Sequence, residues 1–564
     1  MRRGLGWYQR HTTSPWLVFA VILGVLQAIS FRYSMNPDGI AYLDMGDAYL
    51  RGDWATAIRS HWSPLYAWLV AAGLRLTQPP PNLEFPFVHV VNLVIYCLAL
   101  AAFTFLLREI LATLRDVDVA TPEHIGPPEW AWLSVGYAAF VWCTLQYTPL
   151  GLLTPDLLVS VLVYAICAVM LHMRRQPKWR YSVLLGGLLG LGYLAKAPML
   201  PLAVVFLAAT ALVLGSAPSR IRHLVVASVT LAIVALPFIV VLSVANSRPT
   251  IGDSAMFNYL WVVDGVPLVH WQGGPDSIGQ PLHHSQMLMD RPAIFAFDSP
   301  FPVTYAAWYA PEYWLRGATP LVTLGRQLRA MLAALQAYAT LAVDFAGVGV
   351  VLIILLSMRS GPWRISGPTL VLLGPAAAAL AMYALVLAEA RYVAPFMVLL
   401  VLGTLMLARL PKARWSAALS TNASVAIALI FVVQTVTTTS DLASSTFAQV
   451  VQGDALAADD QAQVANALRS AGIVPGDAVA SGDRAFNDYW ARLARVRIVA
   501  EVSGRDGAAI LEADPAARTA AQQLLLAQDV RAVVARGWPA QTGDPGWHPI
   551  AGTDYFYYLV PGRS

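Results

Sequence analysis

The chain has 564 residues, of which 57% are hydrophobic and only 12% are charged. Soluble domains typically carry about 25% charged residues, so this composition excludes an ordinary soluble enzyme and predicts a polytopic α-helical membrane protein. The formal net charge is +4, and nucleic acid is not an expected partner.

Apolar runs of about 17 to 25 residues are long enough to cross a bilayer as helices. The sequence predicts eleven crossings, and up to thirteen fit it. The eleven runs are 15–33, 87–110, 129–147, 150–172, 181–197, 198–215, 223–244, 336–357, 366–388, 392–409 and 415–436. The segment 63–77 is apolar but short, so we expect it to lie on the membrane interface or dip into it.

The charge of the connecting loops predicts the orientation, because Lys and Arg accumulate on the cytoplasmic side. A cytoplasmic N-terminus, with Arg2, Arg3 and Arg10, satisfies this rule. The basic loops that then lie inside are 173–180, 216–223, 358–365 and 409–414. Only the inside loop 111–128 is mixed in charge. The segments that then lie outside are 34–86, the turns near 148, 197 and 390, the loop 245–330 and everything after residue 437. The predicted location is the plasma (inner) membrane.

Two domains follow from this topology. Residues 1–438 form the membrane domain, and residues 439–564 form an extracytoplasmic soluble domain. The soluble part alternates helix-like stretches with short apolar strands, which predicts a small α/β unit. The predicted helices are 455–471 and 514–527, and the predicted strands are 477–480, 496–500 and 530–534. The soluble domain has no glycine-rich phosphate loop.

Five ionisable residues stand at the outside ends of the predicted spans. Asp38 follows the first span in the sequence Asn-Pro-Asp-Gly, Asp156 begins the fourth, and Lys196 ends the fifth. Glu389 and Arg391 form the last outside turn. Since ionisable groups near the membrane are usually functional, their arrival at one face predicts an active site there. A carboxylate such as Asp38 could act as a general base toward an acceptor hydroxyl or amine.

Each of these residues also has an ordinary structural explanation. Asp38 could solvate the end of a helix, and Asp156 could stabilise the helix that it begins. Lys196 could extend its amine to the interface, or it could bind a carboxylate or a phosphate. Glu389 and Arg391 could pair only to close a turn, although a guanidinium also suits a phosphate.

The outside loop 245–330 is rich in aromatic residues and histidine. Its Trp261, Trp271, Trp308 and Trp314 suit stacking on sugar rings, and they also suit the headgroup layer, where Trp is common anyway. The pair His283–His284 could bind a metal, but it lacks a third ligand at a suitable spacing.

Several short motifs in order resemble the GT-C superfamily of integral membrane glycosyltransferases. The closest branch contains the protein O-mannosyltransferases and the lipid A aminoarabinose transferases, and the resemblance covers about residues 15–410. The motifs are Asp38-Gly39-Ile40-Ala41-Tyr42 with Gly52-Asp53-Trp54, His61-Trp62-Ser63-Pro64-Leu65-Tyr66, Asp156, Leu194-Ala195-Lys196-Ala197-Pro198, and Arg391-Tyr392 with Pro395.

The resemblance implies an inverting transfer from a polyprenyl-phosphate-linked sugar donor, on the extracytoplasmic face, to a lipid, glycan or protein acceptor. Membrane lipids are further partners. It implies Asp38 as the base or acceptor-orienting carboxylate and Asp156 as a second catalytic acid. The substrate-binding residues are then Lys196 and Arg391, on the donor phosphate, with Glu389, Tyr42 and His61.

Two departures from the family pattern leave the acceptor and the use of a divalent metal open. Gly39 stands where most relatives carry an acidic residue, and Trp62 replaces a proline. Some relatives use a metal and others do not, so no cofactor is assigned.

Two other classes of function compete with a glycosyltransferase. A lipid or glycan transporter would place ionisable groups near the membrane midplane and often carries an internal repeat. Neither feature is evident in the sequence. A non-catalytic protein with an external glycan-binding domain fits the C-terminal part, but it does not explain the ordered motifs of the membrane part.

Overall fold

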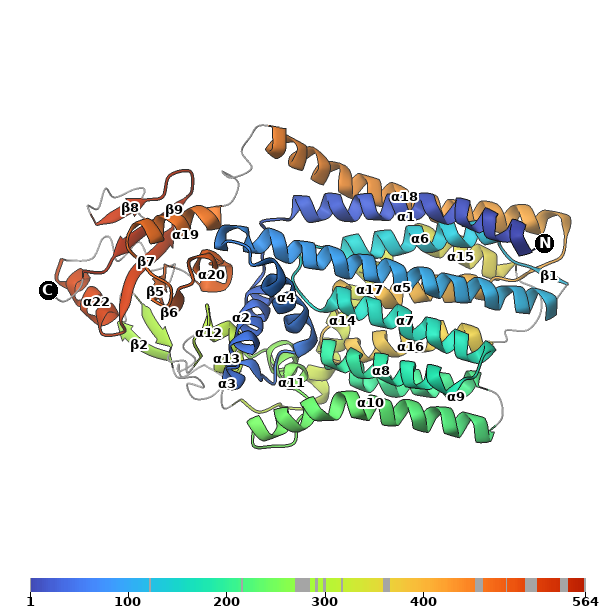
Figure 1. Ribbon diagram of the computed structural model, residues 1–564, viewed down its shortest axis with the longest axis horizontal. Helices are drawn as coiled ribbons and strands as arrows, with labels where there is room; N and C mark the ends of the chain where they lie inside the picture. The colour runs from blue at the N-terminus through green and yellow to red at the C-terminus, as the bar shows by residue number, and fades with distance from the viewer. Residues whose placement is uncertain are drawn as a thin grey trace.

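The computed structural model is an elongated molecule with a helical bundle at one end and a β-sheet at the other (Figure 1). It describes residues 2–120, 123–214, 217–268, 285–289, 293–297, 301–315, 318–358, 366–451, 460–482, 484–502, 515–537 and 546–561. The predicted fold class, a polytopic helical membrane protein with a small C-terminal sheet domain, is confirmed.

Each of the eleven predicted spans corresponds to a helix of the bundle, and one of them to a pair of helices. These are α1 (Arg2–Ser30), α5 (Glu84–Ala120), α6 (Glu129–Tyr147), α7 (Asp156–Arg175), α8 (Trp179–Ala195), α9 (Met199–Val213), α10 (Ala217–Ala245), the pair α14 (Leu324–Asp344) and α15 (Ala346–Ser357), α16 (Gly367–Ala384), α17 (Ala390–Leu407) and α18 (Arg414–Val451). Among the described residues, seven helices are long and apolar enough to cross a membrane, or eight if the bent pair is one span. The remaining three, α6, α8 and α9, lie within the same bundle (Figure 1).

The prediction of one span over 336–357 missed a break in the chain. Helices α14 and α15 meet at an angle of 80°, with Phe345 between them. The broken end is held by two hydrogen bonds from neighbouring helices. Tyr147 Oη donates to the Asp344 carboxylate at 2.7 Å, and Gln434 Nε2 donates to the Asp344 carbonyl at 2.8 Å. The bond from Gln434 satisfies a backbone carbonyl that the bend removes from the helical pattern, and the bond from Tyr147 satisfies the Asp344 side chain.

Short helices lie between the bundle and the sheet (Figure 1). They are α2 (Pro37–Arg51), α3 (Trp54–Ala57), α4 (Pro64–Thr77), α11 (Ser254–Asn258), α12 (Ala306–Tyr309) and α13 (Glu312–Leu315). Helix α4 covers the segment 63–77 and, with 14 residues, is shorter than a membrane crossing requires. These helices come from both predicted outside segments, 34–86 and 245–330.

Within the described residues, the larger sheet has seven strands in the order β2-β3-β6-β5-β7-β9-β8. Its central strands, β6 (Arg497–Val502), β5 (Ala478–Ser481) and β7 (Val530–Arg536), are parallel and match the three predicted strands. Antiparallel β9 (Tyr555–Leu559) and β8 (Trp547–Pro549) follow at one edge. Helices α19 (Asp460–Ser470) and α22 (Pro515–Leu526) correspond to the two predicted helices, so the α/β character is as expected.

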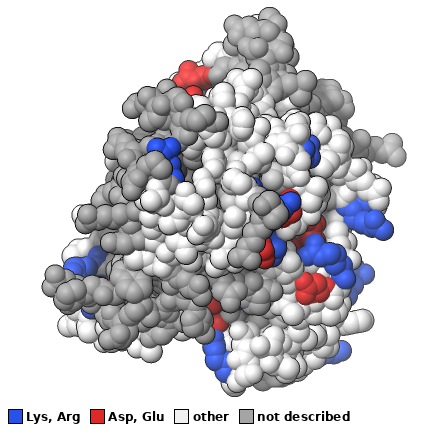
Figure 2. Space-filling model, turned by 90° about the vertical axis from the view of Figure 1, so that its left-hand side faces the viewer, with Lys and Arg blue, Asp and Glu red and all other residues white. Residues whose placement is uncertain are grey.

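The other edge of the sheet comes from a distant part of the chain. Strands β2 (Ser285–Met289) and β3 (Ile294–Phe297) belong to the segment 245–330, and β3 pairs with β6 in antiparallel fashion. The sheet is therefore not built from residues 439–564 alone. Figure 2 views this end of the molecule, where basic and acidic side chains are interspersed on the described surface, as is usual for a face in water.

Candidate active site

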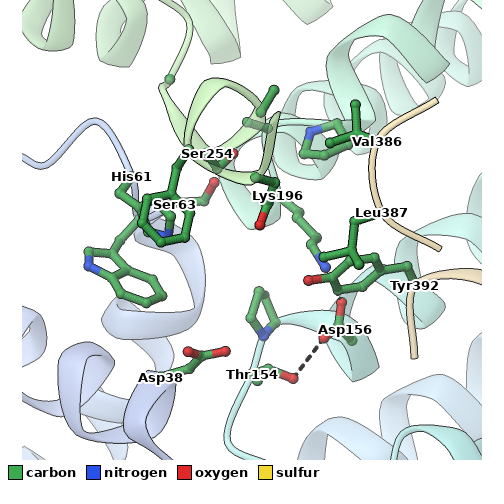
Figure 3. A pocket seen from close by; sticks show the side chains of 18 of the residues that line it. Asp38, His61, Ser63, Thr154, Asp156, Lys196, Ser254, Val386, Leu387 and Tyr392 are labelled. Atoms are coloured by element: carbon green, nitrogen blue, oxygen red, sulfur yellow. Dashed lines mark hydrogen bonds and ion pairs between the residues drawn. The ribbon is translucent and has the colours of Figure 1, made fainter. Parts of the chain in front are cut away.

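A cavity of about 380 Å³ opens where the short helices meet the bundle. All seven site residues predicted from the sequence line it: Asp38, Tyr42, His61, Asp156, Lys196, Glu389 and Arg391. They arrive from α2, the α3–α4 connection, the start of α7, the α8–α9 turn and the α16–α17 turn. Figure 3 shows the cavity, with Asp38 on one side and Lys196, Asp156 and Tyr392 on the other.

Asp38 lies in the first turn of α2, where Asn36 is the N-cap and Pro37 begins the helix. Its side chain is 21% exposed. Each carboxylate oxygen accepts one hydrogen bond, from Trp308 Nε1 at 3.2 Å and from Arg391 Nη1 at 3.3 Å. Burial raises the pKa of Asp38 above its ordinary value, while Arg391 and Trp308 oppose this rise. A carboxyl with a raised pKa is closer to what a general base at neutral pH requires.

Asp156 is more deeply buried, with a side chain that is 3% exposed. It begins α7, and its carboxylate accepts hydrogen bonds from Thr154 Oγ1 at 2.9 Å and from Lys196 Nζ. The first of these bonds is drawn in Figure 3. Lys196 thus binds a carboxylate on its own side of the cavity, and it does not simply extend toward the interface.

Arg391 joins the two halves of this charged cluster. Its Nε donates to Glu389 at 2.6 Å, which is the internal pair that would close the turn. Its Nη1 also reaches across the cavity, 3.3 Å from Asp38 and 3.8 Å from Asp156. The guanidinium therefore does more than close the turn, because it bridges carboxylates from two other elements.

The Tyr392 ring contacts both cations of the site. Lys196 Nζ lies 3.4 Å from the centroid of its ring, and Arg391 Cζ lies 5.0 Å from it. Both contacts have the geometry of cation–π interactions. The sequence prediction did not include Tyr392 among the site residues, although its place directly after Arg391 in the Arg-Tyr motif was a usable signal.

The two remaining predicted residues lie on the aromatic side of the cavity. The Tyr42 ring contacts Trp62 and Tyr66 edge-on, with centroids 5.2 and 5.1 Å apart. The His61 ring contacts Trp62 at 4.5 Å and Phe257 at 4.8 Å. Burial lowers the pKa of His61 to about 3, so this imidazole is neutral at physiological pH.

The aromatic loop predicted to contact sugar is described in part. Trp261 and Trp308 line the cavity, whereas Trp271, His283 and His284 lie outside the described residues. Within the described ranges, no group of three or more His, Cys, Asp or Glu side chains could hold a metal ion. The carboxylates of the site face the cations Lys196 and Arg391.

Gly39 has a steric reason to be glycine. A Cβ atom at this position would lie 2.7 Å from Leu153 Cβ and 2.9 Å from Met35 Sδ. Helix α2 therefore packs closely against the loop that precedes Asp156, and Leu153 N donates to Asn36 Oδ1 at 2.9 Å in the same contact. Glycine at position 39, where the resembled family usually has an acidic residue, thus allows α2, which carries Asp38, to pack against the loop that leads to Asp156.

We expect Gly39→Ala to destabilise the protein by about 1–3 kcal/mol, the usual cost of overpacking, and to lower its activity. The added methyl group forces α2 away from Leu153. Thermal unfolding in detergent measures the first effect. Gly187→Ala is the matched control, because no atom lies within 4 Å of the position that its new methyl group would take. An equal loss of stability in both variants would contradict the steric explanation.

Replacing Trp308 by Phe should shift the acidic limb of the pH–activity profile to higher pH. The indole hydrogen bond favours the charged form of Asp38, so its removal raises the pKa of this carboxyl further. A higher pH is then needed to reach the base form. The pH dependence of kcat/KM is the measurement. Trp261→Phe alters another aromatic residue of the cavity, and its acidic limb should coincide with that of the wild type.

No protein-family model matches the sequence, and no curated protein matches it. Among solved structures, the chain is similar to ArnT from Cupriavidus metallidurans bound to undecaprenyl phosphate. The TM-score is 0.53 at 13% identity, over 97% of this chain and 98% of that chain. The apo state of the same protein gives a TM-score of 0.51 at the same identity and coverage. This chain therefore shares the fold of ArnT over nearly its whole length, which confirms the fold expected from the sequence resemblance.

Proposed function

We propose that this protein is a membrane glycosyltransferase that moves a sugar from a polyprenyl-phosphate-linked donor to an acceptor. One observation carries the proposal. A single cavity combines a partly exposed carboxylate, Asp38, with two cations, Lys196 and Arg391. This is the set of groups that such a transfer needs, because a base must face the acceptor and positive charge must face the leaving phosphate.

The cavity suits a lipid-linked phosphate on chemical grounds. Lys196 and Arg391 supply the charge, and Met382, Val386 and Leu387 add apolar lining beside them. ArnT, which shares the fold, has been crystallised with undecaprenyl phosphate. A bound phosphate would replace carboxylate partners of the two cations, so that donor binding would free Asp38 from part of its contact with Arg391.

The reaction that these groups support is a single displacement with inversion. The acceptor oxygen or nitrogen attacks the anomeric carbon as the bond from this carbon to the phosphate oxygen breaks. The acceptor proton passes to the Asp38 carboxylate, and polyprenyl phosphate leaves with the bonding electron pair. Lys196 and Arg391 stabilise the charge that develops on the departing phosphate. Asp156 holds Lys196 in place, which makes it a positioning residue in this scheme.

The proposed location of the chemistry is the extracytoplasmic face of the plasma membrane. Residues of the short helices α2 and α11 line the cavity, and these helices lie at the end of the bundle that adjoins the sheet (Figure 1). The described basic loop 173–180 joins α7 to α8 at the opposite end of the bundle. Because Lys and Arg accumulate on the cytoplasmic side, this arrangement supports a cytoplasmic N-terminus and an extracytoplasmic C-terminal domain.

The test is a transfer assay with the purified full-length protein. The protein is incubated with radiolabelled polyprenyl-phosphate sugars and a membrane extract, and label is followed into lipid, glycan and protein fractions. Transfer of label with release of polyprenyl phosphate is the expected result, and an inverted anomeric configuration supports the single displacement. Binding of the donors without transfer of any of them would reject the enzyme and favour a lipid or glycan transporter.

A further inference from the structure

One arginine of the sheet domain is buried among acidic residues of the helical part. Arg492 belongs to α20 (Trp490–Ala494), and its side chain is 4% exposed. Nη2 and Nε donate to the two oxygens of Glu84, at 2.6 and 3.3 Å. Nη1 lies 2.9 Å from Asp44 and 2.7 Å from Asp47. Glu84 begins the long helix α5, whereas Asp44 and Asp47 both belong to α2.

The contact with Asp44 fixes the helix that presents Asp38. Asp38 and Asp44 are six residues apart in α2, which is about 9 Å along a rigid helix. Asp44 also accepts hydrogen bonds from the backbone N–H and the hydroxyl of Thr304, both at 2.9 Å. Arg492 therefore binds the Asp44 carboxylate of α2, and the same carboxylate binds the segment around Thr304.

The segment around Thr304 leads back to Asp38 by a second route. Trp308 follows Thr304 by four residues and donates its indole N–H to Asp38. The sheet domain also contacts this indole directly, since the Phe486 ring lies edge-on to Trp308 with centroids 5.2 Å apart. The sheet domain therefore contacts both partners of the Trp308–Asp38 hydrogen bond. It contacts Trp308 through Phe486, and it contacts α2, the helix of Asp38, through the Arg492–Asp44 pair.

From this arrangement we propose that Arg492 is a positioning residue for Asp38, and that the sheet domain sets the geometry of the catalytic carboxylate. A buried ion cluster is weak evidence for stability, because desolvation of the charges offsets much of their attraction. What the cluster does provide is a fixed register between α20, α2 and α5. The proposal rests on the proposed transferase function, which it deepens by assigning a role to the C-terminal domain.

The test compares Arg492→Gln and Arg492→Lys with the matched control Arg495→Gln. Arg495 lies on the same segment and pairs with two of the same acids, Glu84 at 3.3 Å and Asp47 at 3.7 Å. It is 35% exposed, and the structure gives it no ion pair with Asp44. The control therefore removes an equal charge from the cluster without removing the hold on Asp44.

We expect Arg492→Gln to lower kcat about 100-fold, the scale of a misplacement of about 1 Å. The KM for the donor should stay within about twofold of the wild type, because the proposed phosphate ligands Lys196 and Arg391 are not on α2. Arg492→Lys should restore part of kcat, since an ammonium keeps the charge but not the forked geometry. Arg495→Gln should keep kcat within about twofold.

A second readout does not depend on activity. Hydrogen exchange of the full-length protein should become faster in Arg492→Gln within α2 and residues 304–309, and it should stay unchanged in α7. If Arg492→Gln does not fold, Arg492→Lys and Asp44→Asn replace it in both assays. A wild-type kcat in the folded variants, or an equal loss in Arg495→Gln, would overturn the positioning role. If the wild-type protein shows no transfer activity, the proposed transferase function is rejected instead. In that case, unchanged hydrogen exchange of α2 in Arg492→Gln would separately overturn the positioning role.

Discussion

Asp38→Asn should lower the rate of sugar transfer by about 10²–10⁴-fold, the usual contribution of a general base. Asparagine has the same shape and can still accept the hydrogen bond from Trp308, so the fold and the cavity should persist. It cannot take a proton from the acceptor. Arg391 loses one carboxylate partner but keeps Glu389 at 2.6 Å and Asp156 at 3.8 Å.

The measurement is single-turnover transfer at saturating donor, combined with the affinity for polyprenyl phosphate. The affinity should be unchanged or higher, because a negative charge beside the phosphate is removed. Asp116→Asn serves as the matched control, since this residue is 54% exposed and pairs with Arg175 at 3.5 Å, away from the cavity. Equal transfer by Asp38→Asn and the wild type would exclude Asp38 as the base.

The second large effect is expected for Lys196→Gln. This change removes a proposed phosphate ligand, which should lower kcat/KM by about 10²–10³-fold, as the loss of one oxyanion donor does. It also leaves Asp156, 3% exposed, without its closest cation. Breaking a buried ion pair costs about 3–5 kcal/mol, and we expect the lower end because Arg391 lies 3.8 Å away.

The double variant Lys196→Gln/Asp156→Asn separates the two effects. Removing the second charge should recover most of the stability, because no unpaired carboxylate remains buried. It should not recover activity, because the phosphate still lacks its ammonium partner. Thermal unfolding and kcat/KM are measured on the same preparations. Recovery of activity together with stability would show that Lys196 is only a structural partner of Asp156.

The bundle and the central sheet strands could be predicted from the sequence because their signals are local. A hydrophobic run of sufficient length predicts a membrane helix whatever lies elsewhere in the chain. Alternation of helical and apolar segments likewise indicated the strands β5, β6 and β7. The break at Phe345 was missed, because it depends on partners from two other helices, Tyr147 and Gln434. Strand β3 was missed because its partner β6 lies about 200 residues further along the chain, and β2 joins the sheet only through β3.

The sequence by itself determined which residues could carry chemistry and at which end of the bundle they belong. Hydropathy and loop charge can be read from neighbouring residues alone. The topology predicted from them placed Asp38, Asp156, Lys196 and Arg391 on the same face of the membrane. Only the tertiary structure decided which of them touch. Arg391 meets Asp38 across a separation of 353 residues, and Arg492 of the sheet domain meets Asp44 of α2. Such contacts depend on how helices pack and where side chains point, which no local pattern in the sequence encodes.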